Sequence, residues 1–208
     1  SFLFYIAALI MAITIHEFAH AYMADRLGDP TPRIQGRLTL NPLAHLDPLG
    51  TILLFLVRFG WGKPVQFDPF NLRNPRRDGA LISLAGPASN ILLAGVVSIL
   101  LRILGAISIT NYSLPLVLVT GFLEQLILLN VILAVFNLVP IHPLDGFKIV
   151  LGMLPPERAR EWAELERYGM FFLLFILFPI FSNQPLVYTV IGPIIGLLLG
   201  IFLPGASF

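Results

Sequence analysis

The chain has 208 residues, of which 57% are hydrophobic and only 12% are charged. Charged residues make up about a quarter of an ordinary globular domain, so this composition indicates an integral membrane protein. The net charge of +1 gives no sign of nucleic-acid binding, and the lack of cysteine excludes disulfides, thiolate ligands and cysteine nucleophiles. Seventeen prolines and seventeen glycines predict broken helices and re-entrant loops, which a membrane accepts only where protein or water covers the backbone.

Hydrophobic stretches of the length needed to cross a bilayer, about 20 residues, recur along the chain. Five are expected to cross it: residues 2–24, 79–101, 116–139, 168–181 and 186–203. A sixth hydrophobic segment, 49–59, is too short to cross and is bracketed by glycines. We expect it to belong to a re-entrant or strand-like hairpin over about residues 37–62. The predicted fold is therefore an all-α polytopic membrane protein with one added membrane-associated hairpin.

The basic residues predict how these segments are oriented in the membrane. Twelve of the thirteen lie in the two loops 25–78 and 140–167. By the positive-inside rule both loops are expected on the cytoplasmic side, with the N-terminus outside and the C-terminus inside. Residues 156–168 are rich in charge and are expected to form a helix on the same surface.

Three ionisable residues lie on one turn of the first predicted span, near its cytoplasmic end: His16, Glu17 and His20. Histidines at i and i+4 share one helical face and can bind a single metal ion. Each ionisable side chain in hydrocarbon costs about 2.5–3.5 kcal/mol to insert, so three together require a functional reason. The pattern is typical of zinc peptidases, in which the glutamate takes a proton from the attacking water.

A catalytic zinc ion takes three protein ligands, and without cysteine the third must be His, Asp or Glu. Asp145 is the favoured candidate, because it ends a hydrophobic run that Pro140 and Pro143 interrupt. An unwound chain can return a carboxylate to the first span, and Gly146 permits a tight turn beside it. The alternative is that Asp145 only caps a short helix over 147–153.

Three further polar residues are candidates for the same site. His142 could be a fourth ligand or a second-shell donor, or could simply bond to backbone. Asn137 could hold the backbone or the oxyanion of a substrate, or could serve as polar contact between helices. Asn90 ends a run of small residues, 85–90, that permits close approach to the first span. It could face the site and help to hold the backbone or the oxyanion of a substrate.

These residues together resemble the site-2 proteases, which are intramembrane zinc metalloproteases, in their compact prokaryotic form. The resemblance covers about residues 10–150 and includes an Asn-Pro…Asp-Pro-x-Gly loop at 41–50. The other matching elements, in the order of the family, are His16-Glu17-x-x-His20, Gly86-Pro87-x-x-Asn90 and Asn137-x-x-Pro140 followed by Leu144-Asp145-Gly146. It implies zinc held by His16, His20 and Asp145, with Glu17 as general base and acid.

The expected function is that of a zinc-dependent intramembrane endopeptidase that cleaves transmembrane segments of membrane proteins. We expect a catalytic membrane core over 1–155 and an interfacial helix with membrane helices over 156–208. A substrate helix would have to unwind, and pairing with an edge strand around 49–59 would satisfy its backbone. The alternative is a non-catalytic metal-binding membrane protein, either an inactive relative or a transporter. Clustering of the ionisable groups at one depth argues against a transporter.

Overall fold

The computed structural model describes residues 2–57, 60–107, 113–179 and 184–203. Over these residues the structure is helical, and the β-structure found there is an isolated bridge between Leu46 and Gly62. The all-α class predicted from the sequence is therefore confirmed.

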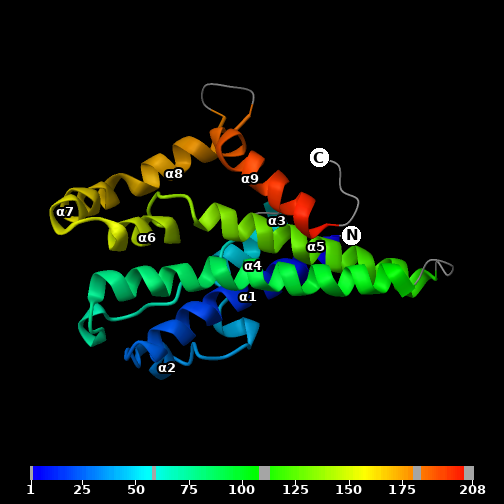
Figure 1. Ribbon diagram of the computed structural model, residues 1–208, viewed down its shortest axis with the longest axis horizontal. Helices are drawn as coiled ribbons and strands as arrows, with labels where there is room; N and C mark the ends of the chain where they lie inside the picture. Colours follow the sequence, from blue (N-terminus) through cyan, green and yellow to red (C-terminus); the bar gives the residue numbers. More distant parts are fainter. Residues whose placement is uncertain (1, 58–59, 108–112, 180–183, 204–208) are drawn as a thin grey trace.

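Three long apolar helices form the centre of the molecule: α1 (Phe2–Arg26), α4 (Pro75–Ile107) and α5 (Leu114–Asn137). Each is long and apolar enough to cross a membrane. Helices α4 and α5 lie side by side along the long axis of the molecule, with α1 packed against both (Figure 1). The first three predicted spans correspond to these helices, which enclose the main hydrophobic core.

The fourth and fifth predicted spans correspond to shorter helices. Helix α8 (Gly169–Leu177) has nine residues and α9 (Leu186–Phe202) has seventeen, and the two form a V above α5 (Figure 1). Both are shorter than the roughly 20 residues that a perpendicular span requires. Five crossings therefore remain a prediction, and residues 180 and 181 of the fourth segment lie outside the described part of the chain.

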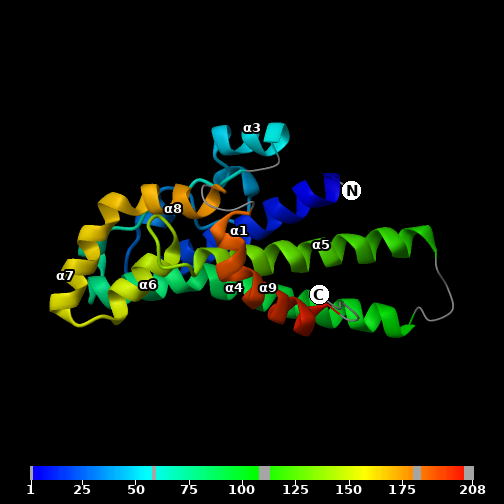
Figure 2. The same cartoon turned by 90° about the horizontal axis from the view of Figure 1, so that it is seen from above.

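The strand-like alternative for the segment after α1 is wrong, because Pro48–Val57 forms helix α3. Its hydrophobic residues run without alternation from Ile52 to Val57, a pattern that suits a buried strand or a helix equally. Asp47 favours a helix, since its carboxylate accepts a 2.8 Å hydrogen bond from the Gly50 N–H. Helix α3 lies to one side of the three long helices (Figure 2), although its Leu54 belongs to the main hydrophobic core. Its re-entry into a bilayer remains a prediction.

The remaining elements are short: α2 (Thr31–Ile34), η1 (Pro42–Ala44), η2 (Pro69–Asn71), α6 (Asp145–Met153), α7 (Pro156–Glu164) and η3 (Leu165–Tyr168). Helix α7 with η3 confirms the charged helix expected over 156–168. Its Trp162 stacks on Phe147 and donates a 3.1 Å hydrogen bond to the Phe147 carbonyl, so α7 packs on α6. The predicted division at residue 155 falls between these two helices and stays a prediction.

Asp29 joins the loop after α1 to the loop before α4. Its buried carboxylate accepts hydrogen bonds from the Thr31 N–H and hydroxyl, the Asp68 N–H and the Asn71 amide, at 2.6–3.0 Å. Burial by itself would raise the pKa of Asp29, but these hydrogen bonds outweigh burial and lower it. Asp29 therefore holds the loop before α4 close to the end of α1.

Replacing Asp29 by Asn should destabilise the protein by about 2 kcal/mol at pH 7, because backbone donors lose a charged acceptor. The folded pKa lies below the unfolded value near 3.9. The stabilisation that the Asp29 carboxylate contributes is thus complete above its pKa in the unfolded protein. It is lost as the pH falls through its pKa in the folded protein. Thermal unfolding in detergent should show the gap between variant and wild type narrowing from about pH 5 to pH 3. A constant gap would show that the charge plays no part.

Candidate metal centre

The structure brings together three of the predicted site residues from two distant parts of the chain. His16 and His20 lie on one face of α1, and Asp145 is the first residue of α6. Asp145 Oδ2 lies 3.1 Å from His16 Nε2 and 3.2 Å from His20 Nε2. Both histidines are buried, and the three ligand atoms lie within 4.8 Å of one another.

This arrangement fits a metal ion better than a set of hydrogen bonds. Asp145 Oδ2 is buried yet has no hydrogen-bond partner among the described residues. Tetrahedral zinc with bonds of about 2.0–2.1 Å separates its ligand atoms by roughly 3.3–3.4 Å, close to the observed distances. The helix-cap alternative for Asp145 finds no support, since the cap position is Leu144 and the Asp145 side chain faces α1.

Each histidine is oriented by a partner on its other ring nitrogen. His20 Nδ1 lies 2.7 Å from the carbonyl oxygen of Ile82, and His16 Nδ1 lies 2.7 Å from Asn90 Oδ1. An acceptor at Nδ1 requires the hydrogen there and leaves Nε2 free to bind a metal. Helix α4 supplies both acceptors, so it sets the orientation of both rings.

Asn90 therefore has a different place from the one that the sequence suggested. It is fully buried behind His16, and its amide nitrogen donates to the Ala12 carbonyl at 3.0 Å and to Asn130 Oδ1 at 2.7 Å. With both ends of the amide engaged in this way, Asn90 does not offer a donor to a substrate. It orients the His16 ring instead of holding substrate or an oxyanion.

Asn130 is a residue that the sequence reasoning missed. It is fully buried on α5, between apolar neighbours. The sequence feature that could have pointed to Asn130 is the one that pointed to Asn137, namely an amide side chain within a hydrophobic span.

Gly86 allows α4 to approach the two histidines. A Cβ atom at this position would overlap His20 Nε2 and would lie 2.7 Å from His16 Cε1. Any side chain here would occupy the space of the imidazole rings. The small residue in the Gly-Pro-x-x-Asn pattern is therefore required for the close approach of α4 to the two histidines.

The turn that carries Asp145 is packed from two sides. A Cβ atom on Gly146 would overlap the carbonyl oxygen of Leu138, so glycine is needed for close approach of α6 to the end of α5. A Cβ atom on Gly169 would likewise overlap His142. The turn is thus held between α5 and the start of α8.

His142 and Asn137 lie outside the group of convergent ligand atoms. His142 Nδ1 is 3.6 Å from Glu166 Oε1, and its ring meets Phe147 edge to face. Asn137 is half-buried and donates a 2.9 Å hydrogen bond to the Leu133 carbonyl of its own helix. A substrate-binding role for Asn137 and a second-shell role for His142 stay predictions.

Glu17 is half-buried next to His16, and a backbone amide from a distant loop holds it. Its Oε2 accepts a 2.9 Å hydrogen bond from the Val65 N–H. A Cβ atom on Gly62 would lie 3.7 Å from Glu17 Oε1, so the loop passes close to both carboxylate oxygens. The loop after α3 therefore orients the carboxylate beside the metal ligands.

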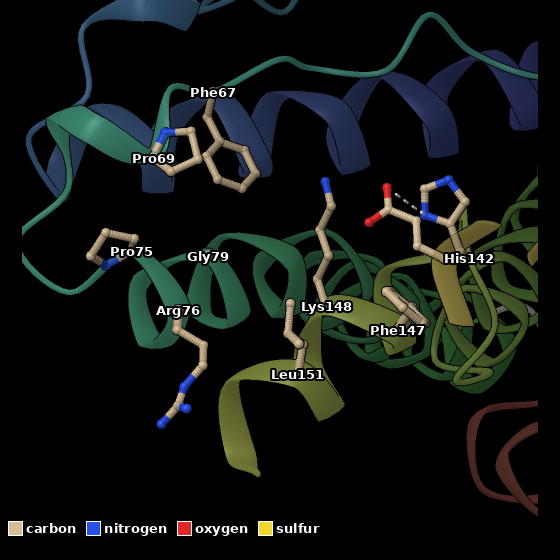
Figure 3. Close-up of a pocket in the computed structure, with 10 residues that line it drawn as sticks. Phe67, Pro69, Pro75, Arg76, Gly79, His142, Phe147, Lys148 and Leu151 are labelled. Carbon is tan, nitrogen blue, oxygen red and sulfur yellow. Dashed lines mark ion pairs between the residues drawn. The ribbon is translucent and has the colours of Figure 1, made fainter. Parts of the chain in front are cut away.

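A cavity of about 180 Å³ lies beside the Asp145 turn, between α6 and the start of α4. Lys148 extends into it from α6, between Phe67 and His142 (Figure 3). The Lys148 ammonium nitrogen is 4.9 Å from the centre of the Phe67 ring, an attractive cation–π distance. The cavity combines apolar walls with the charged groups of Arg76, Lys148 and Glu166.

The long apolar helices and the buried three-ligand centre define a membrane protein with a metallopeptidase-like site. The sequence model that defines peptidase family M50, the site-2 protease family, matches residues 4–179 of this chain. The chain belongs to this family. The resemblance inferred from the sequence is thereby confirmed.

Two curated relatives cover most of the chain. It is 39% identical over 190 residues to the "Putative zinc metalloprotease YwhC" of Bacillus subtilis, covering 91% of this chain and 84% of the relative. It is 34% identical over 179 residues to the "Putative zinc metalloprotease Rip2" of Mycobacterium tuberculosis, covering 83% of this chain and 66% of that relative. No solved structure shows a significant match.

Proposed function

We propose that the protein is a zinc-dependent intramembrane endopeptidase that cleaves transmembrane segments of membrane proteins. The observation that carries the proposal is the meeting of His16, His20 and Asp145 inside the helical bundle, with Glu17 on the same turn. Membership of family M50 and the names of the relatives support zinc as the metal. The two histidines and the aspartate would hold it.

When bound, zinc lowers the pKa of a water molecule and polarises the scissile carbonyl group. Glu17 would take the proton from the attacking water and deliver it to the leaving amine nitrogen. The Val65 N–H holds Glu17 Oε2, which leaves Oε1 to face the water. Asn137 lies at the end of α5, before the Asp145 turn, and would hold the substrate backbone there.

A transmembrane substrate would have to unwind locally, because a helix hides its carbonyl groups from the site. Pairing with a strand at 49–59 is excluded for Pro48–Val57, where the backbone groups are engaged in helix α3. The non-helical segment that follows Gly62 is a different place where the backbone of an unwound substrate could pair. It begins at the Leu46–Gly62 bridge and passes Glu17 at Val65, so an extended peptide beside it would lie next to the general base.

The basic loops support a multi-pass protein of the cell membrane with the site near the cytoplasmic face. The cavity at Lys148 and Arg76 lies at the end of the molecule that carries these loops, beside the turn of Asp145. Water would reach the site from this side.

Metal analysis of the detergent-purified protein tests the proposal. Wild type should contain about one zinc ion per chain, as a three-ligand catalytic site predicts. Asp145→Ala should lose it, because two imidazoles alone hold zinc weakly. Asp47→Ala removes an aspartate whose carboxylate caps α3 and lies outside the group of convergent ligand atoms, so this variant should keep its zinc. Wild type without zinc after reconstitution, or Asp145→Ala with full zinc, would contradict the proposal.

A further inference from the structure

The buried amide of Asn130 has no part in the proposed hydrolysis of the peptide bond. The side chain is 0% exposed on a helix that is otherwise apolar at this level. Burying an amide in an apolar environment costs several kcal/mol unless hydrogen bonds compensate. Leucine would fill the same position without the cost of burying an amide. The hydrogen bonds that Asn130 makes therefore indicate what this side chain does.

We propose that Asn130 is a positioning residue for the metal centre, acting through Asn90 to hold His16 with Nε2 toward the metal. The inference rests on the zinc site of the proposed function. Three hydrogen bonds form the chain: Asn130 Nδ2 to the Leu126 carbonyl at 2.8 Å, Asn90 Nδ2 to Asn130 Oδ1 at 2.7 Å, and His16 Nδ1 to Asn90 Oδ1 at 2.7 Å.

Backbone carbonyl groups determine the direction of this chain. The Leu126 carbonyl only accepts, so the Asn130 nitrogen faces it and the Asn130 oxygen faces Asn90. The Ala12 carbonyl also only accepts, so the Asn90 nitrogen serves both Ala12 and Asn130. The Asn90 oxygen is left for His16, whose Nδ1 must then carry the hydrogen.

The opposite orientation of Asn90 would damage the metal centre. A flipped amide would present its NH₂ group to His16 Nδ1 and favour the tautomer with hydrogen on Nε2. That nitrogen could not then bind a metal. Asn130 and Ala12 supply the two acceptors that oppose the flip, so removal of Asn130 takes away one of them.

The two histidines differ in their need for such support. His20 Nδ1 meets the backbone carbonyl of Ile82, which cannot exchange donor for acceptor. His16 meets a side-chain amide, which can do so by rotating. Asn130 therefore matters for His16 and also ties α5 to α4 at the level of the metal ligands.

The test compares zinc affinity, measured by competition with a chelator, for variants at position 130. Asn130→Leu keeps the volume and should weaken zinc binding about tenfold, the lower end of the range for outer partners of metal ligands. Asn130→Asp should restore affinity, because a neutral carboxylic acid offers one donor and one acceptor. The visible spectrum of the cobalt-loaded protein should shift in Asn130→Leu and return in Asn130→Asp. Gln125→Leu removes another amide from α5 and should change neither readout.

A double variant separates positioning from a general structural role. If Asn130 acts through Asn90, then Asn90→Ala with Asn130→Leu should bind zinc no more weakly than Asn90→Ala alone. Additive losses would overturn the proposal. Asn130→Gln keeps the amide but displaces its oxygen, and we expect it to lose as much zinc affinity as Asn130→Leu. It serves as the test variant if Asn130→Leu does not fold.

The outcomes distinguish this inference from the proposed function. Wild-type affinity in both Asn130→Leu and Asn130→Gln, with zinc lost in Asp145→Ala, would overturn the role of Asn130 and leave the metal site standing. Absence of zinc binding in wild type would overturn both.

Discussion

Glu17→Gln should lower the rate of peptide-bond cleavage by about 10²–10⁴-fold while zinc content stays at the wild-type level. The glutamine keeps an acceptor for the Val65 N–H, so the side chain can stay in place. It cannot take a proton from water, and general acid–base catalysis is lost. Cleavage of quenched fluorescent transmembrane peptides in detergent measures the rate, and metal analysis of the same samples measures zinc.

Glu161→Gln is the matched control, because it makes the same chemical change at an exposed position of α7. Its cleavage rate should equal that of wild type. Undiminished turnover in Glu17→Gln would rule out Glu17 as general base. Wild type that binds zinc but cleaves none of a broad set of transmembrane peptides would favour the non-catalytic alternative.

Gly86→Ala should remove most of the zinc and, with it, the activity. The added methyl group would overlap His20 Nε2 and crowd His16 Cε1, so α4 and α1 must separate or the rings must turn. In an ordinary helix, replacing Gly by Ala stabilises the helix by about 1 kcal/mol. A loss of zinc in Gly86→Ala could therefore not be explained by lower helix propensity. Zinc per chain and the thermal stability of the zinc-free protein are the two measurements.

Gly105 provides the control on the same helix, since a Cβ atom there meets nothing within 4 Å. Gly105→Ala should keep full zinc and full activity. Full zinc in Gly86→Ala would show that the helices can move apart without disturbing the ligands, and that the close approach at Gly86 is not needed for metal binding.

The local signals in the sequence were strong where a residue type conflicts with its surroundings. His16, Glu17 and His20 are costly in a hydrophobic span, and Asp145 follows a run broken by prolines. The same reasoning applied to Asn90 and Asn137 selected amides in spans but could not assign their partners. Asn130 satisfies the same criterion and was not selected.

The segment after α1 shows where such reasoning fails. A short run of hydrophobic residues suits either a strand or a helix, and periodicity does not separate them. Asp47 and Pro48 at the start of α3 favour the helix. Whether it enters the bilayer depends on its neighbours in the membrane, since hydrophobic length alone does not decide it.

The sequence by itself determined the membrane class, the three long apolar helices and the candidate metal ligands, because burial of ionisable groups in hydrocarbon is too costly without a partner. Only the tertiary structure decided how the ligands are held. It placed the Ile82 carbonyl, Asn90 and Asn130 behind the histidines, and it showed that Gly86 leaves room for their rings. Hydrogen-bond partners and close approaches depend on the spacing of helices from distant parts of the chain, which no local pattern contains.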